Sequence, residues 1–329
     1  MTSTIAASET VQSVTVPDAA LAIETRGLVK RFGTQLAVND VNLSVPRGSV
    51  FGFLGPNGSG KTTTIRVLLG LAAATSGTVR VLGEDMPDQL ASVLPRIGAL
   101  VEGPGFYPFL SGTANLHRLD SADRFASPAT RKARVSAALE RVGLSHAAGK
   151  KVHAYSLGMK QRLGIANALL MPRELLVLDE PTNGLDPQGT REVRTLVRSL
   201  AADGITVFVS SHLLDEIELI CTHAAVMSVG RIVAQGTLDE LRRTGEVYVR
   251  IITPDDDLAR AALAALGIPA GYPVGGRLSA LLPDPSIAPE TIVSALVAAG
   301  VRVRGFDIEG ATLEDRFVAL TGEGFDVAQ

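Results

Sequence analysis

The residues best suited to chemistry form a glycine-rich run that ends in a lysine and a hydroxyl. The run is Gly55-Pro56-Asn57-Gly58-Ser59-Gly60-Lys61-Thr62, with Thr63 next. Glycines, lysine and hydroxyl at this spacing are the pattern of a phosphate-binding loop, whose backbone N–H groups turn inward around the phosphates. We expect Lys61 to reach the β- and γ-phosphates of a nucleotide and the Thr62 hydroxyl to bind Mg²⁺. Thr63 would cap the following helix or hold the α-phosphate.

Two acids and a histidine stand at the ends of two other apolar runs. Asp179 and Glu180 follow Leu175 to Leu178, and His212 follows Val207 to Ser211. Alone, the acids fit a surface cap about as well as a site, and a lone histidine is usually structural. Beside a phosphate-binding loop, however, Asp179 would bind Mg²⁺ directly or through water. Glu180 would then orient and deprotonate the attacking water, and His212 would hydrogen-bond the γ-phosphate.

The apolar pattern predicts the elements that position these residues. Strands are expected at Leu21 to Thr25, Val41 to Val45 and Ser49 to Leu54, and a helix at Lys61 to Leu71. The glycine run therefore lies between a buried strand and a helix N-terminus, whose positive dipole end favours phosphate. The unbroken apolar runs 175–178 and 205–209, each preceded by a helical segment, are typical of buried parallel strands. The pattern predicts an α/β core.

The chain divides into three parts by its pattern. Residues 1–20, rich in Ser, Thr and Ala, predict a flexible tail. Residues 21–242 form the α/β core, with a helical subdomain at about 103–172, and residues 247–329 predict a small α+β domain after a polar linker. The strands expected in that last domain are Val247 to Ile252, Leu278 to Leu282 and Val301 to Phe306, and the helices are Leu258 to Leu266 and Ile287 to Ala299.

Composition limits the partners and the compartment. The 329 residues are 46% hydrophobic, enough for two domains with buried cores, and a net charge of -3 gives no general reason to bind nucleic acid. The single cysteine, Cys221, is expected to be a small core side chain. The longest apolar run, Val67 to Ala74, is far shorter than the roughly 20 residues that span a bilayer. With no secretory signal apparent at the N-terminus, we expect the chain to stay in the cytosol.

One further run adds a fourth motif. It is Tyr155-Ser156-Leu157-Gly158-Met159-Lys160-Gln161-Arg162. A Ser-x-Gly turn that opens a helix ahead of an Asp-Glu pair resembles the signature of ABC ATPases. In motif order, the chain from Leu21 to about Leu241 resembles the nucleotide-binding subunits of ABC transporters. The resemblance implies a P-loop ABC ATPase core that uses ATP and Mg²⁺.

The resemblance also implies further site residues. Phe32 would stack on the adenine ring, although ordinary packing remains the alternative, and Asp186 would belong to the D-loop Asn183 to Asp186. In this family two such domains pack head to tail, so Ser156 and Gly158 would contact the γ-phosphate held by the other chain. A homodimer is therefore expected.

Two departures from the family pattern stand out. Leu157 and Met159 replace the usual glycine and glutamine of the signature. Glu102 takes the place of the usual Q-loop glutamine, and its carboxylate would bind Mg²⁺ and the nucleotide or, without metal, be repelled by the nearby acids. We therefore expect Glu102 among the cofactor and metal ligands.

The resemblance implies a separate multispanning membrane permease as partner and a peripheral position on the cytoplasmic face of the cell membrane. The aromatic run Pro104 to Leu110 would dock that permease or, alternatively, form a core patch. The segment Thr312 to Gly322 resembles the closing motif of bacitracin and daunorubicin resistance exporters, so multidrug or antibiotic efflux driven by ATP-dependent dimer closure is the predicted function. The alternatives are a soluble ABC ATPase acting on ribosomes or nucleic acid, and the ATPase of a lipid exporter or an importer.

Overall fold

The structure is a computed structural model that describes residues 20–103, 105–243, 247–271, 277–284 and 286–310. The strands are β1 Leu21–Phe32, β2 Gln35–Val41, β3 Ser44–Pro46, β4 Val50–Leu54, β5 Ser76–Val81, β6 Glu84–Met86, β7 Ile97–Leu100, β8 Leu175–Asp179, β9 Thr206–Ser211, β10 His223–Ser228, β11 Arg231–Thr237, β12 Val247–Ile252, β13 Leu278–Leu282 and β14 Gly305–Gly310. The α-helices are α1 Lys61–Leu68, α2 Leu90–Val93, α3 Gly112–Ala122, α4 Arg131–Arg141, α5 Leu157–Ala168, α6 Pro187–Ala202, α7 Leu214–Ile220, α8 Leu238–Arg243, α9 Asp256–Ala265 and α10 Pro289–Ala298. Short 3₁₀ helices lie at Leu94–Arg96, Pro128–Thr130, Ser145–Ala147 and Val152–Ala154.

A mostly parallel sheet carries the ends of the apolar runs. Its strand order is β11-β10-β4-β9-β8-β7, and only the outermost pair, β10 with β11, is antiparallel. The central strands β4, β8 and β9 are buried along their whole length, and successive side chains enter two different hydrophobic cores. This two-sided burial explains their unbroken apolar sequences. The predicted α/β class is confirmed.

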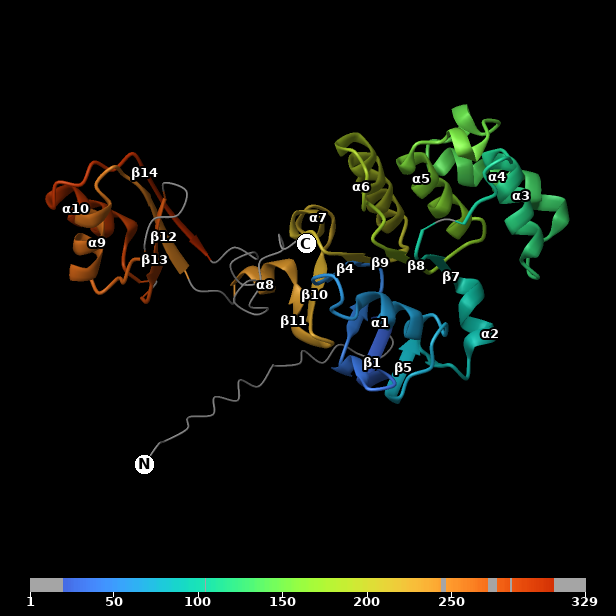
Figure 1. The fold of residues 1–329 in the computed structure, drawn as a ribbon, viewed down its shortest axis with the longest axis horizontal. Coiled ribbons are helices and arrows are strands. Elements are labelled where there is room, and N and C mark those ends of the chain that lie inside the picture. The colour runs from blue at the N-terminus through green and yellow to red at the C-terminus, as the bar shows by residue number, and fades with distance from the viewer. Residues whose placement is uncertain (1–19, 104, 244–246, 272–276, 285, 311–329) are drawn as a thin grey trace.

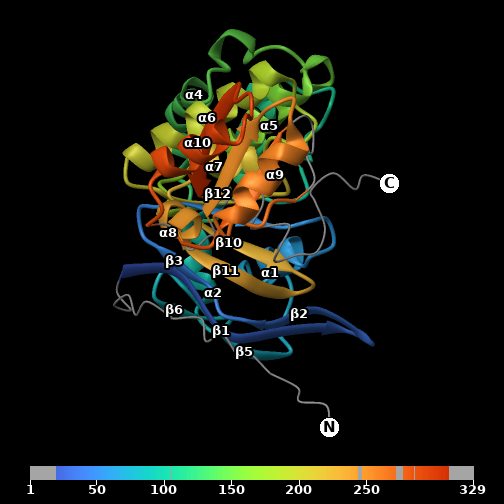
Figure 2. The ribbon, with the colours of Figure 1, turned by 90° about the vertical axis from the view of Figure 1, so that its left-hand side faces the viewer.

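A second, antiparallel sheet covers one face of the parallel sheet. It has the order β2-β1-β5-β6, with β3 also paired to β1. Helix α1 lies between the two sheets and contacts β1, β2 and β5 on one side and β8 on the other (Figures 1 and 2). The prediction of a single strand at Val41 to Val45 was wrong, because β2 ends at Val41 and β3 begins at Ser44. Asp40 has a left-handed φ of 58°, and the Asn42 side chain accepts a hydrogen bond from the Gly27 N–H, so the chain turns there.

A helical layer covers the opposite face of the parallel sheet. Helices α3, α4 and α5 pack on one another, and α5 also contacts β7 and α6 (Figure 1). Their apolar faces form one core with the sheet, in which Leu116, Leu139 and Leu163 are fully or almost fully buried. Cys221 also lies in this core, and its burial raises the pKa of the thiol. None of the helices in the described ranges is long and apolar enough to cross a membrane.

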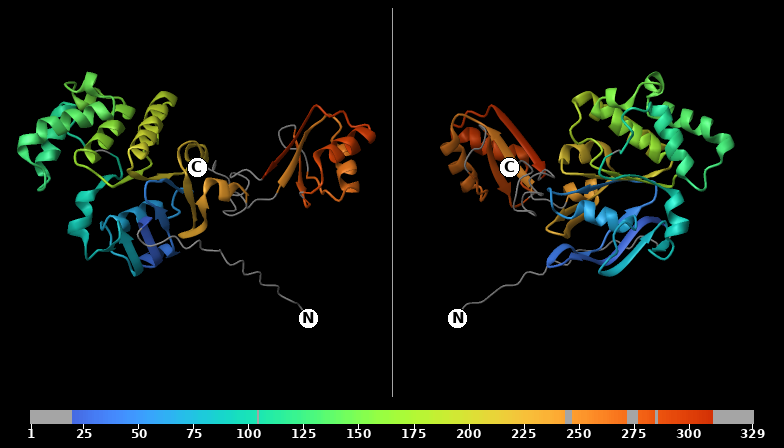
Figure 3. Two further views of the ribbon diagram at one scale, coloured as in Figure 1. Left: turned by 180° about the vertical axis from the view of Figure 1, so that it is seen from behind. Right: turned by 45° about the vertical axis from the view of Figure 1, so that its right-hand side comes forward.

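The segment after residue 247 has its own sheet and core. Its antiparallel sheet has the order β13-β12-β14, and α9 and α10 pack against one face of it (Figures 1 and 3). The core includes Val249, Ile251, Leu263 and Ile292. The strand expected at Val301 to Phe306 was wrong in its position, because β14 runs from Gly305 to Gly310. The predicted tail lies outside the described residues except for residue 20, and so does the segment Thr312 to Gly322.

Candidate functional site

The glycine-rich loop joins β4 to α1 and is held tightly between two neighbours. A Cβ added at Gly55 would lie 2.3 Å from the Met227 carbonyl oxygen of β10, and one at Gly60 would lie 2.4 Å from the Ala37 carbonyl oxygen of β2. Gly60 also has a left-handed φ of 108°. Both positions therefore require glycine, for space at Gly55 and for space and conformation at Gly60. This packing aims the first turn of α1 at the loop, where its unpaired N–H groups favour an anion.

Lys61 lies inside this loop. Its side chain is 5% exposed, and its ammonium donates hydrogen bonds to the carbonyl oxygens of Gly55 at 2.6 Å and Pro56 at 3.2 Å. It also lies 3.6 Å from the Glu180 carboxylate. Burial lowers the pKa of Lys61 below its usual value, although the charges of Glu180 and Asp179 partly oppose this shift. The loop thus holds a buried cation that can exchange carbonyl oxygens for phosphate oxygens.

Asp179 ends β8 beside the first turn of α1. The Thr62 hydroxyl donates to one of its carboxylate oxygens at 3.0 Å, and the Ser210 hydroxyl donates to the other at 2.5 Å. The hydroxyl of Thr62 and the carboxylate of Asp179 thus lie side by side, as the oxygen ligands of a magnesium ion at a nucleotide must. The residues present therefore fit Mg²⁺.

Ser210 was missed by the sequence reasoning. Besides donating to Asp179, its hydroxyl accepts a hydrogen bond from the Glu180 backbone N–H at 3.0 Å, and the side chain is fully buried. A single hydroxyl therefore fixes both acidic residues. The available signal was the pair Ser210 and Ser211 at the end of the otherwise apolar β9, since buried hydroxyls need partners.

Glu180 and His212 face each other across the ends of β8 and β9. The Glu180 Oε2 and His212 Nδ1 atoms are 2.8 Å apart, and both side chains are about a quarter exposed, 21% and 27%. Glu180 has a left-handed φ of 49°, an uncommon conformation for this residue type. The contact at Nδ1 leaves Nε2 of His212 as the other polar atom of the ring. The structure thus brings together Lys61, Thr62, Asp179, Glu180 and His212.

Phe32 and Glu102 lie at the margin of this cluster. The Phe32 ring ends β1, is 47% exposed, and has the Lys30 ammonium 4.6 Å from its centroid. Glu102 forms an ion pair with Arg66 of α1, and its side chain is 58% exposed. In the described part of the chain, Glu102 makes no hydrogen bond or ion pair with Thr62 or Asp179. Its backbone φ of 60° is again left-handed.

Ser156 and Asp186 each begin a helix. The Ser156 hydroxyl accepts the Met159 N–H at the start of α5, and the Asp186 carboxylate accepts the Gly189 N–H at the start of α6. The two turns touch: a Cβ added at Gly184 would lie 3.1 Å from Cδ2 of Leu157. No hydrogen bond among the described residues joins Ser156 or Gly158 to the glycine-rich loop of the same chain. The structure therefore groups Ser156 with Asp186 rather than with Lys61.

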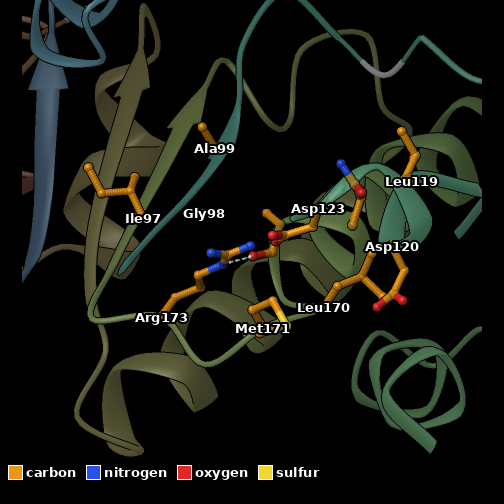
Figure 4. A pocket seen from close by; sticks show the side chains of 11 residues that line it. Ile97, Gly98, Ala99, Leu119, Asp120, Asp123, Leu170, Met171 and Arg173 are labelled. Atoms are coloured by element: carbon orange, nitrogen blue, oxygen red, sulfur yellow. Dashed lines mark hydrogen bonds between the residues drawn. The ribbon is translucent and has the colours of Figure 1, made fainter. Parts of the chain in front are cut away.

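A cavity of about 140 Å³ lies between β7 and the helical layer, apart from all these residues (Figure 4). Beside it, the Arg173 guanidinium donates to the carbonyl oxygens of Ala168, at the end of α5, at 3.0 Å, and of Pro95, before β7. Gly98 allows β7 to approach, because a Cβ there would lie 2.5 Å from the Ala168 oxygen. Arg173 therefore connects α5, the helix that begins after Ser156, to the edge strand β7 of the sheet.

Comparison with known proteins agrees with this arrangement. The family model described as ABC transporter matches residues 38–183. The bacitracin transport ATP-binding protein BcrA of Bacillus licheniformis is 45% identical over 238 residues, which are 72% of this chain and 76% of that protein. The daunorubicin/doxorubicin resistance ATP-binding protein DrrA of Streptomyces peucetius is 35% identical over 311 residues, which are 93% of this chain and 94% of that protein.

A solved structure supports the same assignment. The dimeric post-hydrolysis state of the ATP-binding cassette MJ0796, bound to ADP and Pi, is similar with a TM-score of 0.59 and 25% identity, and the match covers 66% of this chain and 98% of that one. The matching proteins thus support three predictions for this chain: the P-loop ABC ATPase core, the binding of ATP and the hydrolysis of ATP. The chain belongs to the ABC transporter family and is one of its ATP-binding, ATP-hydrolysing proteins.

Proposed function

We propose that this chain is the ATPase subunit of a drug or antibiotic exporter, working as a homodimer on a separate membrane permease at the cytoplasmic face. The observation that carries the proposal is the similarity to DrrA over 93% of this chain, which extends past the cassette into the segment after residue 247. The names of the relatives refer to bacitracin transport and to daunorubicin resistance, which favours efflux over import.

The contacts of the site support a role for each residue. Lys61 would hold the β- and γ-phosphates in place of the loop carbonyls, and Thr62 and Asp179 would hold Mg²⁺, which neutralises charge on those phosphates when it is bound. Glu180 would accept a proton from the attacking water. His212, whose Nδ1 now lies beside Glu180, would donate a hydrogen bond from its ring to the γ-phosphate. The exposed ring of Phe32 would stack on adenine.

The signature turn would serve a second chain. Ser156 is exposed, and its hydroxyl and the N-terminus of the twelve-residue α5 are not bonded to the loop of their own chain. An oriented hydroxyl at a free helix N-terminus suits the γ-phosphate of a nucleotide. In a head-to-tail homodimer, Ser156 and Gly158 would therefore complete the site built around the other chain's Lys61, with Asp186 and the D-loop beside them.

An exposed aromatic surface offers a place for the permease. It consists of Tyr107, Phe109 and Leu110, which are 51%, 76% and 38% exposed, while the neighbouring Phe106 packs on the core. Buried Asn115 accepts the Tyr107 N–H at 2.8 Å and donates to its carbonyl at 3.1 Å, so the loop is held rigid while its rings face outward. A rigid, exposed aromatic group is typical of interface anchors. This exposure favours docking over the alternative of a core patch.

Replacing Phe109 with serine is therefore expected to weaken permease binding at least about tenfold, because aromatic anchors commonly contribute more than about 1.4 kcal/mol. The test is co-purification of the tagged full chain from its own membranes, with basal ATPase activity as a check on folding. Phe125→Ser is the matched control, since Phe125 is 53% exposed but follows the C-terminus of α3, whereas the aromatic surface precedes the N-terminus of that helix. Equal recovery of permease with both variants would exclude this surface, and recovery of ribosomes or DNA with the wild type would support the soluble alternative.

Glu102 leads to a prediction about Mg²⁺. To reach the metal, its carboxylate must leave Arg66, and without metal it would be repelled by Asp179, Glu180 and the phosphates. We therefore expect ATP hydrolysis by the wild type to depend more steeply on Mg²⁺ concentration than hydrolysis by Glu102→Gln, with a midpoint displaced about two- to fivefold. The measurement is ATPase activity against free Mg²⁺ at fixed ATP. Superimposable titrations would show that Glu102 takes no part in metal binding.

A further inference from the structure

A buried carboxylate lies behind the cluster formed by Lys61, Thr62, Asp179, Glu180 and His212. It belongs to a helix that contributes no residue to this cluster. Glu216 of α7 is 6% exposed and belongs to none of the motifs described above. Its Oε2 atom accepts hydrogen bonds from two hydroxyls, those of Thr182 and Ser211, the second at 3.2 Å. A buried carboxylate is costly unless it is well bonded, so this arrangement needs an explanation.

The two hydroxyls belong to the segments that carry the proposed base and its histidine. Thr182 lies two residues after Glu180, in the turn that follows β8, and Ser211 immediately precedes His212 at the end of β9. One carboxylate oxygen therefore joins both segments. The Ser211 hydroxyl also accepts the Leu213 N–H at 3.0 Å, which fixes the chain on the far side of His212.

The second oxygen of Glu216 faces another functional segment. Its Oε1 atom is 3.9 Å from the Arg194 guanidinium of α6, the helix that begins at Asp186. The guanidinium offers partial charge compensation for the buried carboxylate. Glu216 thus stands where the turn after Glu180, the end of β9 and the helix that follows the D-loop meet.

We infer that Glu216 is a positioning residue for ATP hydrolysis, which holds Glu180 and His212 in their mutual orientation through the Thr182 and Ser211 hydroxyls. The inference rests on the proposed roles of Glu180 and His212. Glu216 bonds to neither Lys61 nor the glycine-rich loop, so its loss acts on the chemical step and not on the binding of ATP. Small displacements of a base relative to its substrate cost a large factor in rate.

The test compares three variants of the full-length chain by kcat and KM for ATP, the Kd for a fluorescent ATP analogue, and the melting temperature. Glu216→Ala is expected to lower kcat about 10- to 100-fold, with KM and Kd within about twofold of wild type. Glu216→Gln keeps an oxygen that accepts from the hydroxyls and should stay within about fivefold in kcat. Asp215→Asn is the matched control: Asp215 is exposed on the same helix, and this variant should behave as wild type.

A double-mutant cycle distinguishes positioning from a general loss of stability. Thr182→Val alone should lower kcat severalfold, but in the Glu216→Ala background it should add less than about twofold, because the shared contact is already gone. Fully additive effects, a wild-type kcat for Glu216→Ala, or parallel losses in kcat, ATP affinity and melting temperature would each overturn the inference.

Glu180→Gln, assayed in parallel, separates the two proposals. If Glu180→Gln is inactive and Glu216→Ala is normal, only the role of Glu216 is wrong. If Glu180→Gln keeps wild-type turnover, the assignment of the base is wrong and the inference about Glu216 falls with it.

Discussion

Replacing Glu180 with glutamine is expected to lower ATP turnover by at least about 100-fold while leaving ATP binding within a few fold of wild type, since general bases typically contribute 10²- to 10⁴-fold. The amide keeps the shape of the side chain but cannot accept the proton of the attacking water. Its carbonyl oxygen can still meet Nδ1 of His212, whose present distance to the carboxylate is 2.8 Å. Lys61 keeps its contacts with the loop carbonyls, so the phosphate site remains.

Steady-state ATPase assays and equilibrium binding of ATP measure the two halves of this prediction. Because hydrolysis is expected to reopen the dimer, the variant should also elute as a dimer on size-exclusion chromatography in the presence of ATP and Mg²⁺, and as a monomer without nucleotide. Asp203→Asn is a suitable control, since Asp203 is an acid at the far end of α6 that pairs with Arg141. Normal turnover by Glu180→Gln would assign the base to another group.

Replacing Lys61 with alanine is expected to weaken ATP binding at least about 100-fold and to abolish hydrolysis with it. Charge-assisted hydrogen bonds contribute about 1.5–3 kcal/mol each, and Lys61 would supply more than one to the β- and γ-phosphates. Its loss also leaves Glu180, now 3.6 Å from the ammonium, facing the phosphates without a compensating charge.

Thermal melting with and without ATP separates lost binding from misfolding in this variant. Burial lowers the pKa of Lys61, so the folded chain holds this charge at a cost, and the melting temperature without nucleotide shows directly whether the variant is folded. Added ATP should raise the melting temperature of the wild type and of Lys132→Ala, whose lysine is exposed on α4, but not that of Lys61→Ala. A normal rise for Lys61→Ala would refute its role in binding.

The ends of the parallel strands were predictable because a strand that is buried on both faces has an unbroken apolar sequence. An unbroken apolar run that stops at a glycine, an acid or a histidine identifies both the strand and the functional edge, as at Gly55, Asp179 and His212. The glycine-rich loop was predictable for a different reason, since its spacing is fixed by the phosphates it must surround. These features depend on sequence that is local or nearly so.

The partners of the side chains in the candidate site were not predictable from local sequence. Ser210 meets Asp179 across 31 positions, and Glu216 meets Thr182 across 34, because β8 and β9 lie side by side in the sheet. Glu102 pairs with Arg66, and this pairing depends on the direction in which the left-handed turn at Glu102 points the side chain. Hydrophobic pattern carries no information on these pairings.

The misplaced last strand has a similar cause. Val301 and Val303 alternate with arginines as a strand would, yet the Arg302 N–H donates to the Asp255 carboxylate at 3.0 Å instead of to a neighbouring strand. The Arg302 guanidinium donates a hydrogen bond to the same carboxylate and lowers the pKa of Asp255 to about 2. The carboxylate of Asp255, from a distant segment, thus accepts the hydrogen bond of a backbone N–H that the sequence pattern had predicted to pair within the sheet.

The packing of Leu157 beside Gly184 couples the signature turn to the D-loop. Leu157 stands where the family usually has glycine, and its Cδ2 atom would lie 3.1 Å from a Cβ at position 184. Gly184 has a left-handed φ of 73° as well, so a larger residue there would strain the backbone and require the Leu157 side chain to shift. A graft of the signature turn between relatives should therefore carry the D-loop with it.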